Sequence, residues 1–158
     1  MVIRGVKVLF AALVIAGAVF CIIGFNAGKI PALEIRNSES GRVYLRKPLI
    51  DDGKFSIEFI HSVNQSPVRE TFRAENGMIS IVSVRFASFG AGMRSDLEEG
   101  QTLIRDGEFL VITGFKTSYK ALNYIVGTVS DHILYINDEI ISLRELCGRN
   151  AHIKIRIK

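Results

Sequence analysis

The sequence contains no tryptophan, only three prolines and only two cysteines in 158 residues. The two cysteines lie in different parts of the chain: Cys21 is inside a long apolar run and Cys147 is near the C-terminus. A disulfide framework of the kind that holds small secreted domains together is therefore not expected. We expect Cys147 to be a small, partly buried apolar residue rather than a nucleophile.

Several motifs of catalysis and ligand binding are missing. The sequence has no Gly-x-Ser-x-Gly elbow, no cysteine–histidine signature and no dinucleotide fingerprint. Its three histidines lack metal-ligand spacing. The acidic residues Asp96, Glu98 and Glu99 lack an EF-hand pattern and favour a solvated loop over a calcium site. We therefore predict no catalytic residue, no metal site and no cofactor, although these absences do not exclude an enzyme.

The net charge of the chain is also small. The net charge is +4, and Arg4 and Lys7 contribute two of these four charges, so the rest of the chain carries only +2. That value is too low to indicate nucleic-acid binding. The sharpest basic patch is Lys154, Arg156 and Lys158 at the C-terminus. It fits the solvated face of a last strand, and contact with anionic lipid headgroups is the alternative.

One long apolar run is present, from Val8 to Phe25, with eighteen residues and no charge. As a helix it would be about 27 Å long, enough to cross the hydrocarbon core of a bilayer. Because positive charges precede the run, we expect a cytoplasmic N-terminus and an exported remainder. Poor cleavage positions favour a signal anchor over residues 1–28, with a cleaved signal peptide as the alternative. The expected location is the cell membrane, crossed once, with membrane lipid as a partner and residues 29–158 as an extracytoplasmic domain.

From residue 29 onward, short stretches alternate apolar and polar side chains, which is typical of strands with one buried face. The expected strands are Leu33–Arg36, Val43–Pro48, Lys54–His61, Arg69–Ala74, Met78–Phe86, Leu103–Arg105, Phe109–Thr113, Ala121–Val126, Ile133–Ile136, Glu139–Ser142 and the run from His152 to Lys158. The pairs Asn76-Gly77 and Asp106-Gly107 predict tight hairpins. Ser142–Leu146 favours a brief helical turn. We predict a mainly β domain, an antiparallel sandwich or barrel of about nine to eleven short strands, preceded by one N-terminal transmembrane helix.

His61 and Ser62 are the first candidate binding residues. They lie where the strand Lys54–His61 passes into a polar turn. If the alternation continues, His61 shares the buried face of that strand and needs a hydrogen-bond partner. Ser62 would then point to the other face, so the two cannot form a nucleophile–base pair. A structural histidine that pins the loop and a ligand-binding histidine both fit this pattern.

The segment Ser88–Met93 supplies further candidates, namely Phe89, Gly90, Ala91 and Gly92. The two glycines permit positive φ and close approach of the backbone, so the loop can present N–H groups to an anion. A tight turn or bulge is the alternative. His132, which precedes the strand Ile133–Ile136, is the last candidate and would either cap a turn or join His61 at one site.

At these segments the sequence resembles a bacterial and archaeal family of domains of unknown function, number 1850. The resemblance is carried by His61-Ser62-Val63 with Pro67 and Glu70, by Ser88-Phe89-Gly90-Ala91-Gly92-Met93, and by His132 with Ile141-Ser142-Leu143. It extends over about residues 33–158. Such proteins are small and exported or membrane-tethered, and their genes often lie beside tripartite (TRAP-type) transporters with a solute receptor of the TAXI kind.

The resemblance thus implies an accessory role near a solute importer and no known reaction. Our leading hypothesis is a non-enzymatic accessory or binding module, tethered outside the membrane, with TRAP-type transporter subunits as partners. Two alternatives stay open at this point. One is a small envelope hydrolase that uses His61, with His132 as a second acid–base group. The other is a purely structural envelope protein.

Overall fold

The computed structural model describes residues 30–50, 52–89 and 96–158. The compact unit within this range is Pro31–Lys158. The expected transmembrane helix over residues 1–28 lies outside the described residues and stays a prediction. In the part that is described, no helix is long and apolar enough to cross a membrane.

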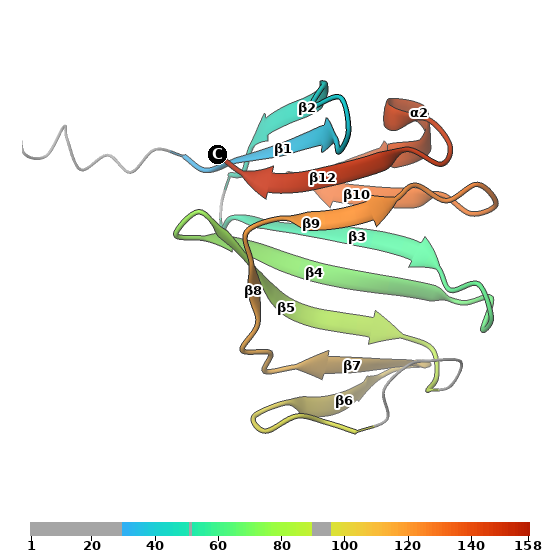
Figure 1. The fold of residues 1–158 in the computed structure, drawn as a ribbon. Coiled ribbons are helices and arrows are strands. Elements are labelled where there is room, and N and C mark those ends of the chain that lie inside the picture. Colours follow the sequence, from blue (N-terminus) through green and yellow to red (C-terminus); the bar gives the residue numbers. More distant parts are fainter. Residues whose placement is uncertain (1–29, 51, 90–95) are drawn as a thin grey trace, which may run out of the picture. The chain divides into compact units, whose positions relative to one another are not determined.

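The described residues of the unit Pro31–Lys158 form two antiparallel sheets and one short helix (Figure 1). The strands are β1 (Ala32–Asn37), β2 (Val43–Pro48), β3 (Lys54–Ile60), β4 (Pro67–Glu75), β5 (Met78–Phe86), β6 (Thr102–Asp106), β7 (Phe109–Thr113), β8 (Ser118–Tyr119), β9 (Leu122–Ile125), β10 (His132–Ile136), β11 (Glu139–Ser142) and β12 (His152–Ile157), and the helix is α2 (Leu143–Cys147). The four-stranded sheet has the order β2-β1-β12-β9. The eight-stranded sheet has the order β11-β10-β3-β4-β5-β7-β6, and β8 pairs with β5 outside this path.

The sheets form where the sequence alternates. In β3, Phe55 and Ile57 are buried, while the alternate residues Ser56 and Glu58 face the other way and are partly exposed. All eleven expected strands are present, most of them within two residues of the expected ends. The short helix α2 confirms the expected helical turn, and β8 is an addition. The prediction of a mainly β, antiparallel domain is therefore confirmed.

Both sheets contribute side chains to one core, so their inner faces pack on each other. The core residues are Leu33, Ile35, Leu49, Phe55, Ile57, Phe72, Ile79, Leu122, Val126, Leu134, Ile136, Leu143, Ile153 and Ile155. The strand orders leave each sheet open, with edges at β2 and β9 and at β11 and β6, rather than closed into a barrel. In Figure 1, β7 and β6 extend away from β1, β2 and β12, so part of the larger sheet lies beyond the smaller one.

The predicted hairpins also form. Asn76 and Gly77 connect β4 to β5 with φ values of 52° and 73°, which suit the mirror-image turn of a two-residue hairpin. Gly107, with φ 62°, begins the turn between β6 and β7. Asn137 and Asp138 join β10 to β11 in the same left-handed region, at 49° and 62°. These turns fix the register of the paired strands, and the register determines which side chains lie on the inner face of the larger sheet and which on the outer face.

Candidate functional site

His61 fixes the turn that follows β3. Its imidazole Nδ1 accepts hydrogen bonds from the backbone N–H groups of Val63 and Asn64, both at 3.4 Å. Its backbone N–H donates to the Ser66 carbonyl at 2.9 Å, and its own carbonyl accepts from the N–H of Gln65 at 2.9 Å. These contacts match a structural, loop-pinning histidine. A ligand-binding role for His61 and for the exposed Ser62 stays a prediction.

His132 is the first residue of β10 and lies opposite Phe59 of β3. Its imidazole stacks on Phe59 with ring centroids 5.4 Å apart and meets Tyr124 edge-on at 5.7 Å. Nδ1 accepts a hydrogen bond from the N–H of Gly127 at 3.2 Å. Burial lowers the pKa of His132, and Arg144 adds to this effect while Asp131 opposes it. The neutral imidazole is thus favoured, with its proton on Nε2.

The glycine-rich candidate segment is only partly described. Gly90, Ala91 and Gly92 lie outside the described residues, so their proximity to His61 and His132 stays a prediction. Phe89 is half-buried and packs edge-on against Phe86, with ring centroids 5.1 Å apart.

Glu70 is a residue that the sequence interpretation did not select as part of a site. It lies in β4 between Ile57 of β3 and Val84 of β5, so its side chain faces the inner, apolar side of the eight-stranded sheet. Tyr124 Oη, from β9 of the other sheet, donates a hydrogen bond to Glu70 Oε2 at 2.6 Å. The signal in the sequence was a carboxylate in the apolar phase of the alternation, between Val68 and Phe72.

Burial has the largest effect on the pKa values of Glu70 and Tyr124. It raises the pKa of Glu70 above its ordinary value, and the hydrogen bond from Tyr124 lowers it by a smaller amount. Burial together with the nearby carboxylate also raises the pKa of Tyr124, so the phenol keeps its proton. Since Tyr124 contacts both Glu70 and His132, these three residues and Phe59 form one linked cluster between the sheets.

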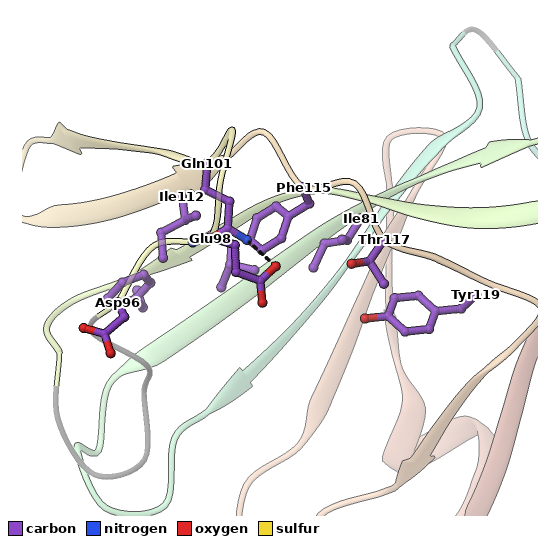
Figure 2. A pocket seen from close by; sticks show the side chains of 10 residues that line it. Ile81, Asp96, Glu98, Gln101, Ile112, Phe115, Thr117 and Tyr119 are labelled. Carbon is purple, nitrogen blue, oxygen red and sulfur yellow. Dashed lines mark hydrogen bonds between the residues drawn. The ribbon is translucent and has the colours of Figure 1, made fainter.

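A groove runs from this cluster along the inner face of the eight-stranded sheet. Its first part has a volume of about 360 Å³ and is lined by Glu70, Phe72, Ile81, Tyr119, Ala121, Leu122, Asn123 and Tyr124. Its second part has a volume of about 240 Å³ and is lined by Ile81, Val84, Phe86, Asp96, Glu98, Gln101, Ile112, Phe115, Thr117 and Tyr119 (Figure 2). The two parts share Ile81 and Tyr119, so they adjoin. We call them together the inner groove.

The lining of the inner groove is apolar with a few polar groups. Figure 2 shows Glu98 between Ile112 and Phe115, with Asp96 beyond Ile112 at the other end of the pocket from Tyr119. Glu98 is held by Gln101, whose side-chain oxygen accepts from the Glu98 N–H at 2.9 Å. The acidic loop at residues 96–99 is therefore partly a wall of the groove and not only a solvated turn.

The groups of the described residues do not assemble a metal centre. Among them, no set of three His, Cys, Asp or Glu side chains could hold a metal ion. Burial raises the pKa of the half-buried Cys147 to about 11, which favours the unreactive thiol over the thiolate.

Two substitutions separate the roles of Tyr124 and Glu70. Tyr124→Phe removes the hydrogen-bond donor from a half-buried carboxylate and should lower the free energy of unfolding by about 1–2 kcal/mol. Glu70→Gln should instead raise the melting temperature at pH 7, because the fold disfavours the charged form. As a control, Tyr119→Phe at a more exposed position should change stability by less than about 0.5 kcal/mol.

The dependence of folding stability on pH tests whether the charged form of Glu70 destabilises the fold. A carboxyl with a raised folded pKa destabilises the fold fully above that pKa and not at all below its ordinary value of 4.5. Thermal unfolding should therefore show an advantage of Glu70→Gln at pH 7 that disappears as the pH falls to about 4.5. An advantage that grows toward acid pH would contradict this assignment.

Comparison with known proteins identifies a family. The family model described as "Domain of unknown function (DUF1850)" matches residues 55–143, more than half of the chain. The match contains every residue that lines the inner groove, whereas β1, β2 and β12 lie outside it. No curated protein and no solved structure matches the chain. The chain therefore belongs to the DUF1850 family of domains of unknown function.

Proposed function

We propose that this protein is a non-enzymatic accessory module of a TRAP-type solute importer, tethered to the membrane by its leading segment and binding a small ligand in the inner groove. The charge-free run Val8–Phe25 supports the tether. The resemblance to family 1850 supports the link with the importer. The inner groove supports a binding role and is the observation that carries this proposal.

The groove has the chemistry of a ligand site. Binding sites for small molecules are concave and mostly apolar, with a few polar groups that orient the ligand. Ile81, Ile112 and Phe115 supply apolar walls, while Glu70 and Asp96 supply hydrogen-bond acceptors. The expected ligand therefore has an apolar body and at least one hydrogen-bond donor.

The contacts of the two candidate histidines restrict the acid–base chemistry that a hydrolase could use. The Nδ1 atoms of His61 and His132 both accept hydrogen bonds from backbone N–H groups. An acid–base role at either Nδ1 would require breaking these bonds, and the half-buried imidazole of His132 resists taking up a proton. The hydrolase alternative would therefore depend on the Nε2 atoms of these histidines.

Filling the groove tests this proposal. Thr117 is exposed and lines the groove, so Thr117→Trp should occupy ligand space without disturbing the core. We expect Thr117→Trp to weaken ligand binding at least tenfold, or by about 1.4 kcal/mol. In cells that carry the importer, solute uptake should fall accordingly. The matched control is Thr102→Trp, at another exposed threonine, which lies in β6 on the outer face of the same sheet.

Far-UV circular dichroism and thermal melting should show both variants folded. Full uptake with Thr117→Trp would contradict a ligand-binding role for the groove. Equal loss with both variants would also contradict it, because the effect would then not depend on the groove.

A further inference from the structure

The outer face of the four-stranded sheet carries a concentration of positive charge. Its cations are Arg36 of β1, Arg46 of β2, Lys154 and Arg156 of β12, and Lys158 just beyond β12. Register places them on one side of the sheet: Arg46 and Arg156 flank Glu34, Lys154 is opposite Arg36, and the backbone of Lys158 pairs with Ala32. We call these five residues the cationic face.

The charge of the exported part is segregated onto this face. Five cations and Glu34 give it a net charge of +4. Since the whole chain has +4 and Arg4 and Lys7 supply two of these charges, the remainder has a net charge of −2. The modest overall charge of the domain thus conceals a strongly positive face and a negative remainder.

Glu34 organises the arginines instead of neutralising them. Its side chain is fully buried beneath them, although it lies on the outer side of the sheet. Arg156 binds Glu34 Oε1 at 2.7 Å, Arg36 lies 3.2 Å from the same oxygen, and Arg46 binds Oε2. One carboxylate cannot satisfy three guanidinium groups, so donors remain for phosphate oxygens, which arginine binds well.

The start of the sheet is close in sequence to the apolar run. Six residues separate Phe25 from Ala32, where β1 begins, and an extended chain of this length spans at most about 25 Å. Ala32 pairs with Lys158, so the chain enters the sheet beside a lysine of the cationic face. A bilayer that held the apolar run would therefore be within reach of this face.

We propose that the cationic face docks on anionic phospholipid headgroups of the bilayer that holds the leading segment. The four-stranded sheet then lies against the membrane, and the orientation of the domain is fixed by charge as well as by the tether. This inference rests on the membrane tether of the proposed function and is independent of the ligand in the inner groove.

A single introduced tryptophan can report the docking, because the natural sequence has none. Val43 of β2 pairs with Arg36, is 40% exposed and lies on the cationic face. The full chain with Val43→Trp is reconstituted into vesicles of acyl-brominated phosphatidylcholine, with or without about one quarter phosphatidylglycerol. Bromine quenches tryptophan emission only at close range, so quenching reports contact with the bilayer.

We expect at least twofold stronger quenching in vesicles with phosphatidylglycerol, and its loss in about 1 M salt, where the Debye length is about 3 Å. The double substitution Lys154→Gln with Lys158→Gln should at least halve the difference between the two lipids, and it spares the arginines around Glu34. Ile104→Trp is the matched control, because Ile104 is 50% exposed on β6 of the other sheet. Its emission should not depend on lipid charge.

Each other outcome contradicts a defined part of the inference. Flotation of the vesicles in a density gradient tests whether the chain is bound to them. If the chain floats with both kinds of vesicle but Val43→Trp is quenched equally or not at all, the proposed docking is wrong and the proposed tether stands. If the chain does not float with vesicles, the tether is wrong and the docking fails with it. Lipid-dependent quenching of Ile104→Trp would place a different face on the membrane.

Discussion

Replacement of Gly127 by alanine is expected to lower the free energy of unfolding by about 3 kcal/mol, at the upper end for overpacking. A Cβ at this position would lie 2.1 Å from the carbonyl oxygen of Ser130 and 3.2 Å from its carbon. Both atoms belong to the backbone, so the 127–132 loop must shift to admit the methyl group. That shift would also disturb the hydrogen bond from the Gly127 N–H to His132 Nδ1.

Chemical denaturation of the variant and of a matched glycine control measures this effect. Gly77 has φ +73°, and a Cβ there would meet nothing within 4 Å. Gly77→Ala should therefore cost only about 1 kcal/mol, through backbone strain alone. If Gly127→Ala were as mild as Gly77→Ala, the loop would not be packed as described, and the placement of His132 would lose its support.

Glu34→Gln is the second substitution with a large expected effect, about 2 kcal/mol of unfolding free energy. The amide keeps the shape of the side chain but removes the charge that holds Arg46, Arg36 and Arg156 together. The arginine side chains are 59%, 28% and 27% exposed, so water relieves part of their mutual repulsion. The expected loss is therefore smaller than for a fully buried ion pair.

The pH dependence identifies this effect as electrostatic. Burial acts to raise the pKa of Glu34, but hydrogen bonds from Arg46 and Arg156 outweigh it and hold the pKa at about 2. A carboxyl with a lowered folded pKa contributes stability above its ordinary value of 4.5 and loses it as the pH falls toward 2. The stability difference between the natural chain and Glu34→Gln should shrink over that interval. A difference that stays constant from pH 7 to pH 2 would contradict this explanation.

Strands with one buried face are readily predicted from the sequence. Phe55 and Ile57 in β3, or Ile153 and Ile155 in β12, repeat with the period of two that a half-buried strand requires. The two residues of β8 are exposed and too few to display a period, so this strand is not predictable from the pattern. The sequence pattern also does not predict which of the two sheets a strand joins, because apolar and polar residues alternate in the same way in both sheets.

The candidate site is less predictable from sequence than the fold. Histidines and glycines attract attention in a sequence, yet His61 and His132 are engaged with their own backbone in the structure. Glu70 and Tyr124 are 54 residues apart and meet only because the two sheets pack together. The same holds for the cationic face, since Arg36 and Arg46 come from the start of the domain and Lys154 and Arg156 from its end. Only β-sheet pairing reveals that these charges are neighbours.

Solute uptake by the importer in cells with and without this chain is the most direct measurement of the central claim, that the protein assists transport by binding. Deletion should reduce uptake severalfold, and the natural chain should restore it. A chain lacking residues 1–28 should restore it poorly, because the proposed signal anchor both exports the domain and tethers it. Unchanged uptake by a fully assembled importer in cells without the chain would contradict the claim.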